Sequence, residues 1–121
     1  MKWFARPAPA DIWDEPIQGP IGDIEAADRI RNICQAARAI AEAAGSSAPT
    51  GTRGRYERAA RVAMEIAMKI SDDLMRDDAV RRIVDLCMKA DDIKTAQILS
   101  RAIQAGWIRE AVQQDYPVLS Q

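Results

Sequence analysis

Residues 63–76 read AMEIAMKISDDLMR, and residues 96–109 read AQILSRAIQAGWIR. The two stretches start 33 residues apart and carry apolar side chains at matching positions. The matched pairs are Ala63 with Ala96, Ile66 with Leu99, Ile70 with Ile103, Leu74 with Trp107, Met75 with Ile108 and Arg76 with Arg109. A repeat of this length is typical of stacked helical hairpins, because one hairpin alone cannot bury its apolar face. The sequence therefore predicts a packing surface rather than a reaction centre.

Apolar residues at helical spacing divide the rest of the chain into further helices. The expected helices cover residues 23–44, residues 55–70, the stretch between Ser71–Asp73 and Asp91–Asp92, the stretch from there to Gly106, and residues 107–115. Asp23 is expected to cap the first helix, and Gly45 is expected to end it. Short connections make neighbouring helices antiparallel. The predicted fold class is therefore all-α, with about five helices in antiparallel hairpins.

Residues 1–22 differ from the helical part of the chain, because their prolines and glycines exclude a stable helix or a central strand. These residues are Pro7, Pro9, Pro16, Pro20, Gly19 and Gly22. The segment also holds Trp3, Phe4 and Trp13, which are half of the six aromatic residues of the chain. Disordered tails usually lack such groups. We expect an extended arm that docks on its own domain or on a partner, with these three aromatic residues as candidate partner-binding groups.

The predicted organisation is an arm at 1–22, one helical domain at 23–115 and a frayed tail at 116–121. A glycine- and serine-rich run at 45–54 is expected to be a flexible connector inside the domain. Trp107 occupies an apolar position of the repeat, so we expect it to pack in the core.

The composition favours a soluble, globular, cytoplasmic protein. The 121 residues are 48% apolar and 29% charged, with a net charge of −1. No signal peptide and no apolar stretch of membrane-spanning length is apparent, so we expect no membrane partner. Cys34 and Cys87 both lie on apolar stripes, which predicts buried thiols in a reducing compartment.

The residue types that commonly carry catalysis are scarce. The chain has no histidine, and two distant cysteines do not form a zinc site. The acidic pairs Asp72–Asp73, Asp77–Asp78 and Asp91–Asp92 lie at expected helix starts, where carboxylates cap free amides. We therefore expect no catalytic residue, no metal, no cofactor and no small-molecule substrate, and we predict that the protein is not an enzyme.

One charged cluster needs a compensating partner, because cations oppose the dipole at the start of a helix. Its members are Arg53, Arg55, Arg58 and Arg61. The cluster could form a solvated face with ion pairs to Glu57 and Glu65, a protein contact, or a contact with an anion or nucleic acid. The neutral overall charge and the lone nearby aromatic residue, Tyr56, do not favour nucleic acid.

Residues 89–96 read KADDIKTA, in which an acidic residue and an apolar residue precede a small one. The positions concerned are Asp92, Ile93 and Ala96. This stretch resembles the turn between helices in tetratricopeptide-type repeats. Asp91 stands where that family has its turn glycine, and Val84 stands at a position where it has a small residue. The resemblance covers at most residues 56–115, and it implies tetratricopeptide-like stacking that binds another polypeptide along a concave face.

Two hypotheses of function follow. The first is a protein-protein interaction or assembly module, in which helical hairpins and the aromatic arm bind a partner protein or a second copy of the chain. The alternative is a small regulator that binds nucleic acid through the arginine cluster. Salt dependence would separate them, because phosphate contacts weaken steeply with salt.

Overall fold

The computed structural model describes residues 11–17, 19–44 and 51–120. These residues form five α-helices, two short 3₁₀ helices and no strand. The α-helices are α1 (Asp23–Ala44), α2 (Thr52–Ala67), α3 (Asp73–Lys89), α4 (Ile93–Ala102) and α5 (Gly106–Asp115), and the 3₁₀ helices are η1 (Ile12–Asp14) and η2 (Pro117–Ser120). The predicted all-α class is confirmed. No helix in the described ranges combines the length and the apolar character needed to cross a membrane.

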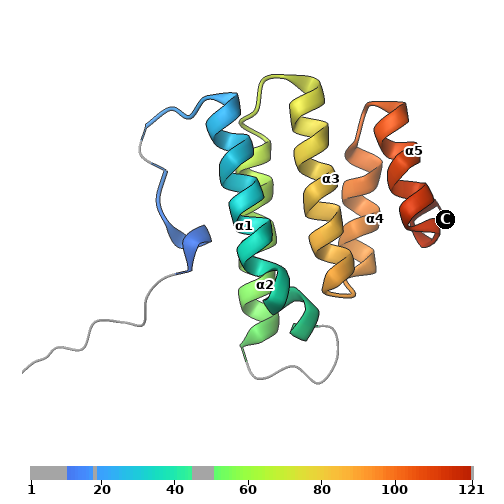
Figure 1. Ribbon diagram of the computed structural model, residues 1–121, viewed down its shortest axis with the longest axis horizontal. Helices are drawn as coiled ribbons and strands as arrows, with labels where there is room; N and C mark the ends of the chain where they lie inside the picture. Colours follow the sequence, from blue (N-terminus) through green and yellow to red (C-terminus); the bar gives the residue numbers. More distant parts are fainter. Residues whose placement is uncertain (1–10, 18, 45–50, 121) are drawn as a thin grey trace, which may run out of the picture.

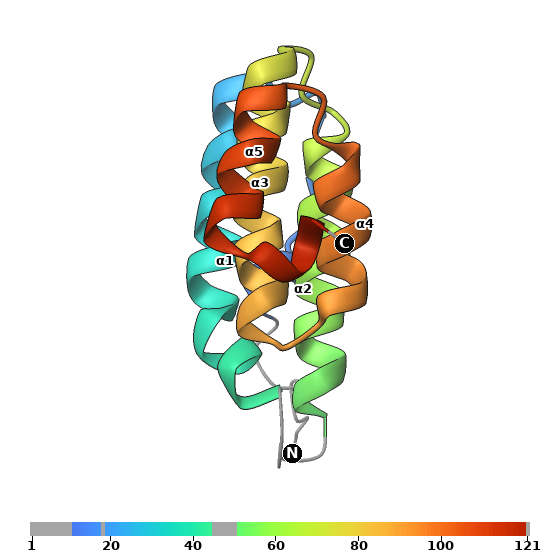
Figure 2. The ribbon, with the colours of Figure 1, turned by 90° about the vertical axis from the view of Figure 1, so that its right-hand side faces the viewer.

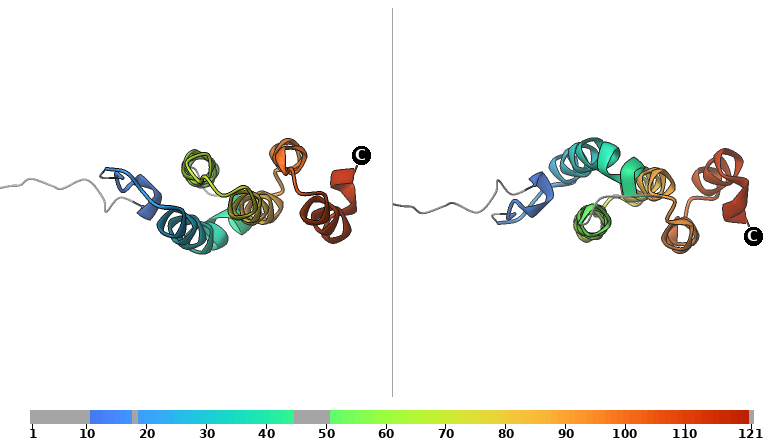
Figure 3. Two further views of the ribbon diagram at one scale, coloured as in Figure 1. Left: turned by 90° about the horizontal axis from the view of Figure 1, so that it is seen from above. Right: turned by 90° about the horizontal axis from the view of Figure 1, so that it is seen from below.

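The five helices run alternately up and down (Figure 1). Seen along the row of helices, they form two layers, with α1, α3 and α5 in one and α2 and α4 in the other (Figure 2). The end-on views show the same zigzag (Figure 3). Helix α3 is central, since it contacts all four other α-helices. Because α1, α3 and α5 are parallel, their first residues lie at the same end of the molecule.

The core lies between the two layers and is rich in small side chains. Its buried members include Ala37 and Ala41 of α1, Ala59 and Ala63 of α2, Ile83, Val84 and Cys87 of α3, and Ala96 and Leu99 of α4. All of these positions belong to the stripes that helical spacing predicts. Alanine on facing helices allows their axes to pack closely. The apolar periodicity of the sequence thus identified the inner faces of α1 to α4.

Several predicted boundaries are wrong. Helix α2 begins at Thr52 and ends at Ala67, so it starts and stops earlier than the expected 55–70. Gly51 precedes the helix with φ of 91°. The last three residues of the predicted connector 45–54, residues 52–54, belong to α2. Gly106 begins α5 instead of ending α4. Residues 45–50 lie outside the described residues.

The expected frayed tail at 116–121 is also wrong over its described part. Residues 117–120 form η2, which contacts α4 and α5. Leu119 is buried there, because it covers apolar groups that the last helix would otherwise expose. Residues 117–120 therefore cover part of the α4–α5 side of the helix stack.

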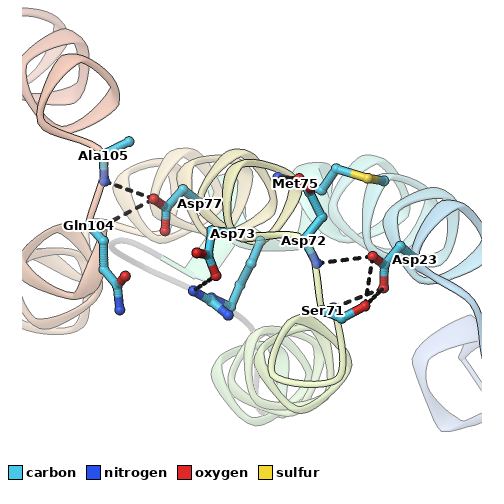
Figure 4. Close-up of polar contacts among 9 residues, drawn as sticks. Asp23, Ser71, Asp72, Asp73, Met75, Asp77, Gln104 and Ala105 are labelled. Carbon is cyan, nitrogen blue, oxygen red and sulfur yellow. Dashed lines mark hydrogen bonds and ion pairs between the residues drawn. The ribbon is translucent and has the colours of Figure 1, made fainter.

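Aspartates fix the connections between helices (Figure 4). Asp72 caps its own helix α3, accepting a hydrogen bond from the amide of Met75 at 2.8 Å. Asp77 lies on α3 but accepts from the amides of Gln104 and Ala105, at 3.2 and 2.8 Å, just before α5. The prediction that Asp77 caps a helix start is therefore wrong, because Asp77 lies inside α3 and binds the connection before α5 instead.

Asp23 departs from prediction in the same way. Its carboxylate, expected to cap its own helix, accepts hydrogen bonds from the amide and hydroxyl of Ser71 and from the amide of Asp72, at 2.9 to 3.0 Å. The start of α1 is thereby tied to the start of α3, as Asp77 ties α3 to α5 (Figure 4). The starts of α1 and α3 are therefore side by side, and the residues before α5 are held beside the second turn of α3.

The turn between α3 and α4 is a Schellman motif. The amide of Asp92 donates to the carbonyl of Cys87 at 2.9 Å, and the amide of Asp91 donates to that of Met88 at 3.1 Å. Asp91 has φ of 57°, in the left-handed region that favours glycine. The chain therefore carries an aspartate where the backbone conformation suits glycine best.

Asp77→Ala should lower the free energy of unfolding by about 1 to 3 kcal/mol, because two amides at the start of α5 lose a buried acceptor. Asp77→Asn keeps one acceptor oxygen and should lose less. Urea unfolding followed by circular dichroism measures both. Equal stability of wild type and Asp77→Ala would contradict this role.

Asp91→Gly should raise the free energy of unfolding by about 0.5 to 1 kcal/mol, because glycine adopts a positive φ without strain. Asp91→Ala is the opposite control and should lower it, since a Cβ without a polar side chain disfavours this conformation. The same urea titration separates the two. A less stable Asp91→Gly variant would refute the explanation.

Candidate interaction surface

Three large hydrophobic side chains are exposed at one end of the α1–α3–α5 layer. Ile24 is 73% exposed, Leu74 53% and Trp107 65%. Each is the second residue of its helix, and the three helices start at the same end of the molecule. The prediction that Trp107 packs in the core is wrong. Trp107 and Leu74 are nevertheless equivalent, as the sequence repeat indicates, because both lie on the solvent side of their helices.

Two of these residues, Leu74 and Trp107, line a groove of about 400 Å³. Its apolar lining residues are Ala27 of α1, Leu74 and Met75 of α3, and Trp107 and Ile108 of α5, and its charged lining residues are Arg31, Asp78 and Arg81. Ile108 is buried, while Leu74 and Trp107 stand out into solvent. Contributions from three helices make the surface concave rather than a single exposed ridge. We call this region the apolar end of the groove.

A second hollow, of about 420 Å³, lies further along α1 and α3. Its cationic lining residues are Arg31, Arg38, Arg82 and Lys89. Arg31 lines both hollows, which therefore lie next to each other along α3, and we refer to the two together as the groove. We call the second hollow the cationic end. Four cations gather there although the whole chain has a net charge of −1.

Asp85 and Tyr116 close one side of the cationic end. The hydroxyl of Tyr116 donates a hydrogen bond to Asp85 at 2.8 Å. Burial, followed by this contact with Asp85, raises the pKa of Tyr116 to about 12, so its phenol is protonated at neutral pH. Asp85 is the one carboxylate that lines this hollow among the described residues, and it is already engaged. The charge offered to a ligand there is therefore positive.

The two thiols have no reactive character. Burial raises the pKa of Cys34, which lines the cationic end, to about 12, and that of Cys87 to about 11. Both are free cysteines, and both carry protonated thiols at neutral pH. The prediction of buried thiols is correct for Cys87, whereas Cys34 is only partly covered.

Trp13 does not have the position of a partner anchor. It lies in η1, is only 3% exposed and packs into the core of its own chain. The arm therefore docks on its own domain at this point, which corrects the candidate role of Trp13 in partner binding. Trp3 and Phe4 lie outside the described residues.

Three of the four clustered arginines contact the chain itself. Arg55 holds Asp11 through two hydrogen bonds of 3.1 and 2.6 Å, and Arg58 contacts Asp11 and Asp14 at 3.4 Å. The guanidinium of Arg55 also lies 6.0 Å from the centre of the Trp13 ring. The compensating carboxylates thus come from the N-terminal segment, not from Glu65.

Arg53 contacts the turn between α3 and α4 instead of the N-terminal segment. It donates to the carbonyl of Ala90 at 3.1 Å and lies 3.7 Å from the carboxylate of Asp92 and 3.5 Å from that of Glu57. Tyr56 is fully buried and donates to Asp92 at 2.8 Å. Arg61 is exposed on the outer side of α2. Arg53, Arg55 and Arg58 are engaged in contacts within the chain, so the four arginines do not form a free basic patch for a ligand.

Two of the predicted acidic pairs, Asp72–Asp73 and Asp91–Asp92, lie at the starts of α3 and α4. The prediction is wrong for Asp77–Asp78, which lies inside α3 beyond its first turn. In the described ranges, no group of three or more acidic or cysteine side chains is close enough to hold a metal ion. Asp92 caps α4 through the amide of Thr95, as predicted.

Sequence reasoning missed Ile24, Leu74 and Trp107 as a surface. A usable signal was present, because each lies off the buried stripe of its own helix. In α1, for example, Ile24 falls outside the spacing that links Ala26, Ile30 and Ile33. A large apolar residue that comes just after a helix start and lies off the buried stripe of that helix indicates an exposed side chain.

Comparisons with protein-family models, with curated proteins and with solved structures found no match to this chain. Its function must therefore be inferred from the arrangement of its own residues.

Docking of the N-terminal segment should weaken in acid. Hydrogen bonds from Arg55 hold the pKa of Asp11 below its ordinary value of 3.8. The undocked segment therefore binds a proton more readily than the docked one, so docking is favoured above pH of about 4 and is lost as the pH falls further. Trp13 fluorescence, in a Trp3→Phe and Trp107→Phe background, should shift to the red over that range.

Asp11→Asn is the control for this pH dependence. Without a titrating carboxylate at position 11, the red shift should be present in part at neutral pH and should change less between pH of about 5 and 2. An identical pH profile in both proteins would show that the Asp11–Arg55 pair does not control docking.

Proposed function

We propose that this chain is a non-catalytic protein-binding module that holds a segment of another polypeptide in the groove of the α1–α3–α5 layer. The observation that carries the proposal is the exposure of Leu74 and Trp107 on the lining of the apolar end, with Ile24 also exposed at the same end of the layer. Grouped apolar side chains that remain exposed are typical of interaction sites. A tryptophan at the edge of a concave surface is the kind of anchor that dominates binding energies.

The helix arrangement supports the same function. Antiparallel hairpins stacked in two layers leave the faces of α1, α3 and α5 along one side (Figure 2). Tetratricopeptide-type repeats, which residues 89–96 resemble, bind polypeptides along a concave face. The left-handed conformation of Asp91, at the place of that family's turn glycine, is consistent with the resemblance.

The chemistry of the described residues supports a non-catalytic role. The chain has no histidine, and its two thiols have raised pKa values. Asp23, Asp77 and Asp92 accept hydrogen bonds that join helices. These groups are therefore used in structure, while the groove offers shape, apolar area and charge.

A library of random peptides displayed on phage tests this function. Peptides selected on the full chain should bind the groove, so Leu74→Ala and Trp107→Ala should each weaken their binding by about tenfold or more. Ile98→Ala is the matched control, since Ile98 is 57% exposed but lies on α4, in the other layer. Its peptide affinity should equal that of the wild type.

Two results would contradict the proposal. In the first, the selected peptides bind Leu74→Ala and Trp107→Ala as tightly as the wild type. In the second, sedimentation shows a dimer of the wild type that Trp107→Ala converts to a monomer, because the groove face would then be occupied by a second copy of the chain.

A further inference from the structure

The groove changes character along α3, from apolar to cationic. Met75, Asp78, Arg82 and Lys89 follow one another at spacings of three, four and seven residues, which places them on one face of the helix. Met75 and Asp78 line the apolar end, and Arg82 and Lys89 line the cationic end. A ligand that follows this face meets apolar contacts first and positive charge about two to four helical turns later.

The cations of this surface are available to a ligand. Arg31, Arg38 and Arg82 pair with carboxylates on their own helices at 2.6, 3.7 and 3.5 Å, and all these side chains are about half exposed. Such pairs within a helix contribute little and exchange readily for another carboxylate. Lys89 has no hydrogen-bond or ion-pair partner in the described part of the chain.

The direction of a bound helix follows from its own dipole. The cationic end lies toward the C-terminus of α3, and the apolar end lies toward its N-terminus. Asp and Glu are favoured in the first turn of a helix, and Lys and Arg in the last. A helix antiparallel to α3 would bring its acidic first turn to the cations, whereas a parallel helix would bring its last turn there.

We infer that the groove takes an amphipathic helix of another polypeptide that runs antiparallel to α3, with carboxylates in its first turn and apolar residues about two to four turns later. This inference rests on the proposed function and specifies its ligand. The carboxylates contact Arg82 and Lys89, and the apolar residues pack on Leu74, Met75 and Trp107. The complementary charge selects both the class of segment and its direction.

Two synthetic peptides of equal composition test the direction. One carries Glu residues in its first turn and Leu residues in its second half, and the other carries them in the opposite order. The same hydrocarbon staple keeps both helical, so that helix formation does not differ. Fluorescence anisotropy with the full chain should show about tenfold tighter binding of the acidic-first peptide.

Charge variants test the residues. The double variant Arg82→Glu and Lys89→Glu should abolish the preference for the acidic-first peptide, and Arg82→Gln with Lys89→Gln should reduce it. The matched control reverses two exposed lysines outside the groove, Lys69→Glu and Lys94→Glu, and should keep the full preference. Circular dichroism checks that each variant is folded.

The outcomes separate this inference from the proposed function. Equal affinity for the two peptides, tighter binding of the reversed one, no binding of either, or a preference that survives the Arg82 and Lys89 variants overturns the inference. If both peptides bind equally and Trp107→Ala weakens both, the protein-binding function stands without it. Failure of the function itself is seen separately, when peptides selected from the random library ignore Leu74 and Trp107.

Discussion

The candidate surface depends on the two hydrogen bonds that Asp77 accepts from the amides of Gln104 and Ala105. Asp77 is buried on α3, so its carboxylate needs donors, and the unpaired amides before α5 supply them. Asp23 makes the equivalent link from α1 to the start of α3. Together they hold the starts of three parallel helices at one end of the molecule, where Ile24, Leu74 and Trp107 are exposed.

The same helix direction explains the polarity of the groove. Lys89 lies in the last turn of α3, where a cation interacts favourably with the helix dipole. Leu74 and Trp107 lie in the first turns of α3 and α5, at the other end of the layer. Parallel alignment of α1, α3 and α5 therefore collects apolar groups at one end of the layer. Cations gather toward the other end, and this gradient can give a bound segment a preferred direction.

Two arginines of α2 have a structural role away from this surface. Arg55 and Arg58 bind Asp11 and Asp14, which offsets the unfavourable position of cations near the start of a helix. This pairing holds Trp13 in the core. Trp13, one of the three aromatic residues that the sequence suggested for partner binding, thus serves the fold, whereas Trp107, expected in the core, is exposed to solvent.

The sequence alone determined the helical class, the inner faces of α1 to α4 and the capping role of Asp72 and Asp92, because these depend on local spacing and on hydrogen bonds within three or four residues. Only the tertiary structure decided where Asp23, Asp77 and Arg55 find their partners, since these lie between 27 and 49 residues away along the chain. It also decided the exposure of Trp107. Periodicity shows that a residue is apolar and where it recurs, but the packing of neighbouring helices determines which apolar residues are covered.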